Sequence, residues 1–375
     1  MNNDTGKQTI SVGQLAILFV SFMIGSSIVY IPNPMIQFAG NMAWLSLIAS
    51  TLMGIILLSL ALYLFRCYPD VPYPEYLNQI FGRWISSVFA ILLMLMLYLM
   101  LSYIVLGIGN FFVNTMMVET PMYVFNGLTI ITAAYTVHAG IEVMGRMFFL
   151  LVSSMLAFVI LIDFMAAPIA RIETLLPLFA DGMKPVLHGI YFSFGFPFAE
   201  LFLFSAIFPF VRKESRPSVG KWMYAMTAIS GFFLLTVVLV TIMTLGPLAG
   251  DRKFSLYSVA RLIQIGQFIS GIEAVVGIAL IAGSFMKATI VLFILNQATS
   301  KFFKLQDDKT VLPAIAFVAF LLSVTMFQKE SEFSYSVNDV WPMITFTVGV
   351  GPMVLAAIIT FMKRWISARK QARKS

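Results

Sequence analysis

Long runs of apolar residues without a single charge alternate along the chain with short polar segments. No charged residue lies between Lys7 and Arg66, and further charge-free runs cover residues 84–118, 222–250 and 340–362. Each run exceeds the ~20 residues that a helix needs to cross a bilayer. The apolar positions do not alternate strictly with polar ones, which favours helices over a β-barrel. The pattern predicts an all-α integral membrane protein.

The same runs predict ten membrane-spanning helices, whose limits follow from the polar residues between them. The expected spans are residues 11–37, 43–65, 84–118, 121–137, 143–168, 185–211, 222–247, 269–303, 311–327 and 341–362. The first is too long for the apolar core of a signal peptide and lacks a small-residue cleavage site behind it. We therefore expect a single transmembrane domain over residues 1–375, with a basic tail at 363–375.

Composition and charge leave little mass outside the bilayer and predict its orientation. Apolar residues make up 60% of the chain and charged residues 11%, against about 25% charged residues in soluble domains. If both termini lie inside, most of the 24 Lys and Arg residues fall in inner segments, so the positive-inside rule predicts cytoplasmic termini. The net charge of +7 then reflects topology and attraction to anionic membrane lipids rather than binding to nucleic acid.

The ten expected spans divide into two halves of similar layout, residues 11–168 and 185–362. In each half the third span is the longest and the fourth is the shortest. Because each half has five spans, the second half must be inserted upside down relative to the first. Inverted repeats of this kind are typical of secondary transporters, so we expect a 5+5 inverted repeat.

Helix-breaking residues fall at matching places in the first span of each half. The first expected span contains Gly25-Ser26-Ser27, and the sixth contains Phe194-Gly195-Phe196-Pro197. In a helix interior glycine costs about 1 kcal/mol and proline about 3 kcal/mol. A break in mid-membrane frees N–H and C=O groups that need partners in protein, water or a ligand. The matched pair predicts a ligand site, although a proline kink or close helix packing would explain either break alone.

Two ionisable residues, Glu200 and Lys287, fall near the middle of an expected span. A charge there costs ~2.5–3.5 kcal/mol on insertion scales and should face a partner or a wet cavity. Glu200 lies one turn beyond the second break, and Lys287 lies three residues after Ser284. A structural ion pair is the alternative to a role in binding. Glu142 and Asp163 lie near the ends of the fifth span and are expected to be structural.

The third span supplies an aromatic candidate. Tyr98 and Tyr103 are five residues apart, so they project at ~140° to each other and only one is expected to face a cavity; Tyr98 is preferred. The little room around the breaks favours a small polar ligand such as an amino acid. The expected ligand-binding residues are Gly25, Ser26, Ser27, Tyr98, Phe194, Gly195, Phe196, Pro197, Glu200, Ser284 and Lys287.

The sequence carries no motif for catalysis, for a cofactor or for a metal. Cys67 is the only cysteine, and His138 and His188 lie near span ends without the neighbours of a catalytic triad or a metal site. We therefore expect no enzyme, no cofactor and no metal. Three functions remain open: a ligand-sensing receptor subunit, a proton- or sodium-coupled amino acid transporter, and a structural subunit whose broken helices only pack partners.

Three short motifs within the ten-span frame resemble a known family. They are Gly25-Ser26-Ser27-Ile28, the stretch from Pro74 to Gly82, and Gly195-Phe196-Pro197. Together with the chain length and the basic tail, they resemble the B subunit of GerA-type spore germinant receptors. That family is related to the amino acid–polyamine–organocation transporters of the LeuT fold. The resemblance covers roughly residues 10–365.

The resemblance implies a subunit that senses a small-molecule germinant in the spore inner membrane, together with a larger A subunit and a lipoprotein C subunit. In LeuT-fold relatives, the eighth span and the first break together hold a sodium ion. The resemblance thus implies that Lys287 replaces this ion, by donating to carbonyls around Gly25 or by pairing with Glu200. Many transporter relatives have glycine where this chain has Ser27, whose Cβ narrows the approach to the backbone.

Overall fold

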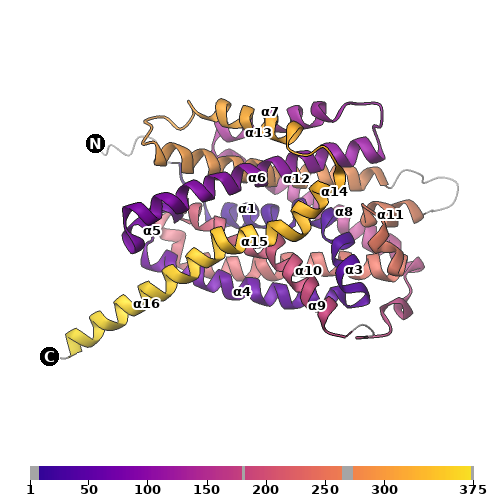
Figure 1. Ribbon diagram of the computed structural model, residues 1–375, viewed down its shortest axis with the longest axis horizontal. Coiled ribbons are helices and arrows are strands. Elements are labelled where there is room, and N and C mark those ends of the chain that lie inside the picture. Colours follow the sequence, from indigo (N-terminus) through magenta and orange to yellow (C-terminus); the bar gives the residue numbers. More distant parts are fainter. Residues whose placement is uncertain (1–7, 180–181, 264–272, 373–375) are drawn as a thin grey trace.

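The computed structural model describes residues 8–179, 182–263 and 273–372, which form a bundle of helices (Figure 1). Within these ranges the only β-type pairing is an isolated parallel bridge between Ile10 and Val211. The all-α fold expected from the sequence is confirmed. The first residues of the eighth expected span, 269–272, lie outside the described residues.

The helices largely follow the expected spans, with interruptions. The first half contains α1 (Val12–Ile24), α2 (Ser27–Tyr30), α3 (Pro32–Ala39), α4 (Ala43–Cys67), α5 (Tyr73–Phe81), α6 (Arg83–Thr115), α7 (Met122–Ala139) and α8 (Ile141–Ala166). The second half contains α9 (Lys184–Ser193), α10 (Val219–Leu245), α11 (Ser255–Leu262), α12 (Glu273–Phe302), α13 (Leu312–Thr325), α14 (Glu330–Tyr335), α15 (Trp341–Thr345) and α16 (Gly351–Ala372). The 3-10 turns are η1 (Gly40–Met42), η2 (Ala167–Ile169), η3 (Ile172–Leu175), η5 (Ala199–Ala206), η6 (Phe208–Phe210), η7 (Lys213–Ser218) and η8 (Gly246–Asp251), and the wider π turns are η4 (Phe194–Phe198), η9 (Ser336–Val340) and η10 (Phe346–Val350).

Eight helical segments of the described chain are long and apolar enough to cross a membrane, so the expected count of ten is not confirmed. The two expected spans outside this set are α7 and α13, which pack against each other along one edge of the bundle (Figure 1). α13 has 14 residues, fewer than the ~20 that cross a bilayer without tilt or thinning. α7 has 18 residues, but Asn126 and His138 lower its mean hydropathy.

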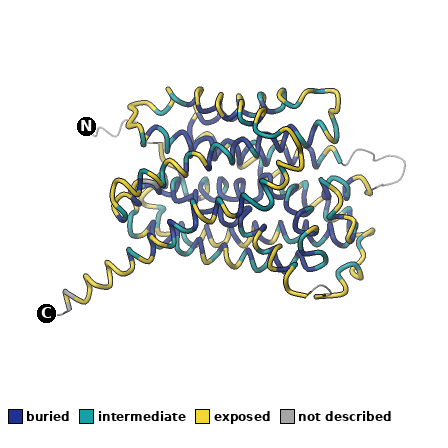
Figure 2. The backbone as a smooth tube through the Cα atoms, in the orientation of Figure 1, coloured by how far each residue is buried: buried dark blue, intermediate teal, exposed yellow. Residues whose placement is uncertain are grey.

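The spans that carry the predicted breaks are among the three most buried of the described spans, and buried segments gather in the middle of the bundle (Figure 2). In the most apolar stretch of each span, 83% of the residues are buried in Val12–Tyr30, 72% in Lys184–Ala206 and 78% in α12, against 28% in Ile141–Ile169. Because lipid hardly reaches these three spans, backbone groups freed by a break find partners in the protein or in a cavity between helices.

The first predicted break is present between α1 and α2. α1 starts at a capping box, in which Ser11 Oγ accepts from Gln14 N–H and the Gln14 side chain accepts from Ser11 N–H. It ends at Gly25, whose φ of −7° and ψ of −106° are non-helical. A Cβ at Gly25 would lie 2.7 Å from Ser21 O and 2.9 Å from Gly283 O, so only glycine lets α12 approach this closely.

The second predicted break is present in the sixth expected span. α9 passes into the wide turn η4, where Phe196 has a non-helical φ of −143° and ψ of 111°. Pro197 has no N–H to donate, and the chain continues from it into the tight turns of η5. Gly195 packs against Pro342, since a Cβ there would lie 2.7 Å from the proline Cγ. The predicted pair of broken spans is confirmed.

The last span begins earlier than predicted. We expected residues 341–362, but the helical path starts at Glu330 with α14 and continues through η9, α15 and η10 into α16 (Figure 1). Charged and polar residues hide this extension in the sequence, because hydropathy reports lipid-facing segments and not helices that line a cavity. The wide turns on either side of α15 keep the path continuous around Pro342.

Candidate ligand-binding site

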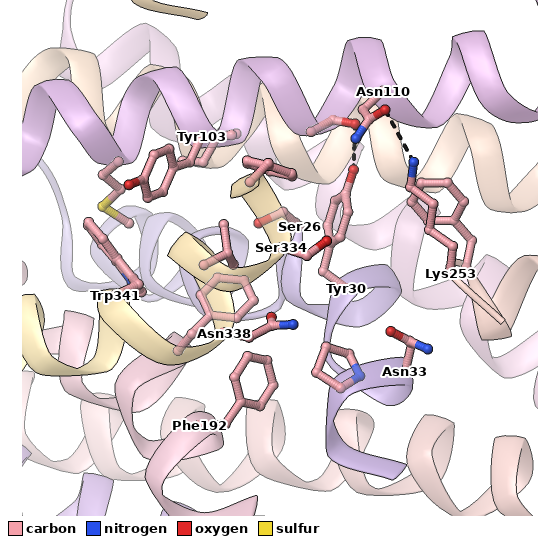
Figure 3. Close-up of a pocket in the computed structure, with 18 of the residues that line it drawn as sticks. Ser26, Tyr30, Asn33, Tyr103, Asn110, Phe192, Lys253, Ser334, Asn338 and Trp341 are labelled. Carbon is pink, nitrogen blue, oxygen red and sulfur yellow. Dashed lines mark hydrogen bonds between the residues drawn. The ribbon is translucent and has the colours of Figure 1, made fainter. Parts of the chain in front are cut away.

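A cavity of about 100 Å³ lies between the two broken spans (Figure 3). Its walls come from α2 and α3 after the first break, from η4 and η5 at the second break, and from α6, α9, α12 and the start of the last span. The residues that line it are Ser26, Tyr30, Asn33, Pro34, Met100, Tyr103, Ile104, Gly107, Asn110, Phe192, Phe196, Glu200, Lys253, Phe254, Lys287, Glu330, Phe333, Ser334, Val337, Asn338 and Trp341.

A fully buried ion pair, called the inner pair here, lies at the deep end of this cavity. Lys287 Nζ lies 2.7 Å from Glu200 Oε2, and the two side chains are 0% and 1% exposed. The second carboxylate oxygen, Glu200 Oε1, accepts a hydrogen bond of 2.7 Å from Trp341 Nε1. The ammonium lies 4.3 Å from the ring centre of Phe196 and 4.9 Å from that of Phe22, within reach of cation–π attraction. One carboxylate and two rings thus hold Lys287, and two donors hold Glu200.

A partly exposed ion pair, called the outer pair here, lies at the opposite end of the cavity. Lys253, which follows η8, pairs with Glu330 at the start of α14, and the side chains are 34% and 44% exposed. Lys253 Nζ also donates to Asn110 Oδ1 of α6 at 3.2 Å (Figure 3). Partial burial lowers the pKa of Lys253, although Glu330 acts to raise it. For the pKa of Lys253, loss of hydration therefore outweighs the attraction of the carboxylate. The contacts of Lys253 connect the loop after η8 to α6 and α14.

Hydrogen bonds attach the half-helices after the first break to their neighbours. Tyr30 OH donates to Gly107 O of α6 at 2.5 Å. Asn33 Nδ2 donates to Gly250 O of η8 at 2.8 Å. These side-chain bonds fix the wall that α2 and α3 contribute to the cavity.

Four of the predicted site residues line the cavity: Ser26, Phe196, Glu200 and Lys287. The predicted residues that do not line it are Gly25, Ser27, Tyr98, Phe194, Gly195, Pro197 and Ser284. Gly25 and Gly195 instead provide close helix contacts at the two breaks. In the described part of the chain, the buried hydroxyls of Ser27 and Ser284 have no hydrogen-bond partner.

Only one of the two tyrosines of α6 lines the cavity, as their five-residue spacing predicts. It is Tyr103 and not the preferred Tyr98. Tyr103 lines the cavity, and its hydroxyl lies 2.9 Å from Ser336 Oγ. Its ring packs edge-on against Trp341, with ring centres 5.7 Å apart. Tyr98 does not line the cavity, because the rotation of ~140° between the two positions turns it to another face of α6.

The wall formed by the start of the last span was not predicted from the sequence. The lining positions there follow a helical period, since 330, 334 and 338 are four apart and so are 333, 337 and 341. The first set is Glu330, Ser334 and Asn338, and the second is Phe333, Val337 and Trp341. These adjacent polar and apolar stripes begin before residue 341, and they could have indicated from the sequence that the last helix starts earlier and lines a cavity. Nothing in the sequence marks Lys253 as a cavity residue.

Solved structures of other proteins define the fold. A Na⁺-coupled sialic acid symporter in a substrate-bound outward-open state matches with a TM-score of 0.71 at 13% identity, over 93% of this chain and 79% of the symporter. MhsT in complex with L-phenylalanine matches with a TM-score of 0.71 at 14% identity, over 94% of this chain and 89% of MhsT. At these identities the likeness shows the fold alone. The protein is a multi-pass membrane protein of the LeuT fold, with the first and sixth spans broken.

Sequence relatives define the family. The family model described as spore germination protein matches residues 9–333, and the chain belongs to this family. Spore germination protein KB of Bacillus subtilis (strain 168) is 26% identical over 373 residues, which covers 98% of each chain. Spore germination protein YndE of the same organism is 20% identical over 234 residues, covering 62% of this chain and 63% of that protein. The family resemblance expected from the motifs is confirmed.

Proposed function

We propose that this protein is the nutrient germinant-sensing subunit of a spore germination receptor and that it binds its ligand in the cavity between the broken spans. Membership in the spore germination protein family supports a role in germination. The observation that supports the location of the binding site is the cavity itself, which is lined by residues of both breaks and by the inner pair. The proposal includes A and C partner subunits, the spore inner membrane as location and cytoplasmic or core-facing termini.

The walls favour a small amino acid as the germinant. The volume of about 100 Å³ is small against the ~300–1,000 Å³ of pockets for drug-sized ligands. Most lining side chains are apolar or aromatic, and the four charged ones form two ion pairs. A zwitterion with a compact side chain fits this balance, because it brings no net charge that needs a new counter-ion.

Lys287 takes part in shaping this site in our proposal. Of the two arrangements expected for its ammonium, the pairing with Glu200 is the one present. A buried ion pair contributes little net stability compared with apolar residues of similar size. We therefore assign the inner pair to the ligand site, where the ammonium stands in for the sodium ion of the transporter relatives.

A thermal-shift panel tests the proposal on the purified protein. We expect one class of small amino acid to raise the melting temperature, since a ligand at 100 times its Kd stabilises by about 2.7 kcal/mol. The matched variants are Tyr103→Ala, which alters the cavity wall, and Tyr98→Ala, which alters the same helix away from it. The shift should weaken only in Tyr103→Ala. A folded protein that no amino acid, sugar or inorganic ion stabilises would contradict ligand sensing and leave the structural-subunit function.

The alternative is a proton- or sodium-coupled amino acid transporter, and the fold favours it specifically, since the matched symporter couples its substrate to Na⁺. The two functions differ in flux. Uptake of the stabilising amino acid into liposomes that contain this chain alone, driven by an ion gradient, would establish transport. Stabilisation without uptake supports the sensor.

A further inference from the structure

A second cavity, called the basal cavity here, lies at the other end of the bundle and has no part in the proposed function. Its volume is about 510 Å³, larger than that of the first cavity. Along α12, Lys287 of the first cavity and Lys301 of the basal cavity are 14 residues apart, which corresponds to ~21 Å of helix. α5, which contributes to the basal cavity, lies at one end of the bundle, and α11, which follows Lys253, lies at the other (Figure 1).

The charges on the wall of the basal cavity are out of balance. Arg83, Lys301 and Lys304 line it, together with a single carboxylate, Glu75. Glu75 pairs with Lys301 at 3.3 Å. Neither Arg83 nor Lys304 has an ion-pair partner in the residues for which the structure gives positions. Two exposed cations on the wall therefore have no ion-pair partner and repel one another and Lys301. A further carboxylate, that of Asp308, accepts from the lining residue Gln297.

The backbone adds to this positive potential. The first turn of α6, with Arg83, Ser86 and Ser87, forms part of the wall. α6 is 33 residues long and has no side-chain cap at its start, so the N–H groups of its first turn carry the positive end of the helix dipole. The helix end therefore adds to the positive potential of the three side-chain cations in the cavity.

The conformation of Lys304 is an independent indication. Its φ is +54°, a left-handed conformation at the end of α12, where Lys304 N–H donates to Lys301 O and Leu305 N–H donates to Ser300 O. Glycine is the usual residue at this position of a helix C-cap, because it has no Cβ to strain. This chain has a lysine at the position, and its side chain lines the cavity, so a charge stands where glycine would fit the backbone without strain.

We propose that the basal cavity binds a phosphate-bearing anion, from a lipid headgroup or from a soluble phosphate compound. Phosphate suits this wall because a guanidinium and two ammonium groups supply several charge-assisted hydrogen bonds to its oxygens. The charged residues of the wall lie between Pro72 and Arg83 and between Lys301 and Lys304, in segments that the positive-inside rule places on the cytoplasmic side. The anion therefore comes from the side opposite the germinant.

Two arms of one experiment separate the sources. The full-length protein in phosphatidylcholine nanodiscs is titrated with inorganic pyrophosphate at constant ionic strength, and the melting temperature is followed. In the second arm, pyrophosphate is absent and the nanodiscs contain phosphatidylglycerol. A saturable rise in the first arm assigns a soluble anion, and a rise in the second arm assigns a lipid headgroup; either outcome supports the proposal.

The variants distinguish the cavity from general attraction to a basic surface. Arg83→Gln and Lys304→Gly should each weaken the half-maximal response about tenfold, which corresponds to about 1.4 kcal/mol. Lys304→Gly also relieves the left-handed lysine, so it should lose binding while the anion-free protein stays at least as stable. Lys309→Gln removes one charge from the same connection without touching the cavity wall. No rise in either arm, or equal weakening in Lys309→Gln, would overturn the proposal.

Discussion

The inner and outer ion pairs of the candidate site have the same chemistry and opposite surroundings. Lys287 and Glu200 are fully buried and 2.7 Å apart, and a tryptophan donor satisfies the second carboxylate oxygen. Lys253 and Glu330 remain about one third to one half exposed and bridge a loop to the last span. The comparison shows that one cavity contains an ion pair in two settings, one as a charge pair fixed in the interior and one as a partly exposed link between a loop and the start of the last span.

Burial decides this difference. Inside the bundle, removing two charges from water costs several kcal/mol per ion, and good geometry only roughly repays that cost. The inner pair therefore cannot open without a large penalty. At the rim, water replaces a lost partner, so an exposed pair contributes ~0–1 kcal/mol and can exchange with a ligand charge.

The largest expected effect comes from breaking the inner pair on one side only. Lys287→Met leaves the Glu200 carboxylate buried with a single donor, Trp341. Loss of one partner of a buried pair costs about 3–5 kcal/mol. We expect a loss of this size in the unfolding free energy, measured by denaturant titration in mixed micelles. An unchanged unfolding midpoint would mean that the two charges are not paired in the membrane.

The double variant Lys287→Met with Glu200→Gln is the control that separates stability from function. It removes both charges and keeps an amide oxygen that accepts from Trp341, so most of the lost stability should return. If the inner pair shapes the ligand site, the germinant should fail to stabilise both Lys287→Met and this double variant, although the double variant has regained most of its stability. A normal ligand response in it would reduce the pair to a structural contact.

A smaller effect is expected from Trp341→Phe, which leaves both charges in place. The change removes only the donor to Glu200 Oε1, and a hydrogen bond to a charged group contributes about 1.5–3 kcal/mol. The unfolding free energy should fall by about this amount, less than in Lys287→Met. A loss as large as that of Lys287→Met would show that Trp341 also positions the last span, which the edge-on contact with Tyr103 would explain.

The residues of the inner pair could be predicted from the sequence because the patterns that mark them are local. A charge inside a long apolar run and a Gly or Pro in mid-span are visible in a single sequence, and Glu200, Lys287 and both breaks were found in this way. The count of spans was less secure. α7 and α13 are short or partly polar, and whether such helices cross the bilayer depends on packing and lipid, not on composition alone.

The rest of the site depends on contacts between distant segments. Trp341 bonds to Glu200 across 141 positions of sequence, and no local pattern specifies that meeting. The choice between Tyr98 and Tyr103 required the rotation of α6 about its axis. A helix with no charge after Arg83 and little amphipathic character does not reveal that rotation. Lys253 lies in a connection, where its partner Glu330 is set by the packing of the last span.

The outer pair gives the smallest expected effect and the clearest contrast. Lys253→Gln should lower the unfolding free energy by at most about 1 kcal/mol, because the pair is partly exposed and screened by salt. Glu330→Gln should behave in the same way, and the small loss in either variant should shrink further as ionic strength rises.

Ligand association is the more sensitive measurement. If the outer pair links elements at the mouth of the cavity, both variants change the association rate of the germinant while the inner-pair variants change its equilibrium affinity. Equal changes in association rate for all variants, measured by stopped-flow at several salt concentrations, would remove the distinction between the two pairs.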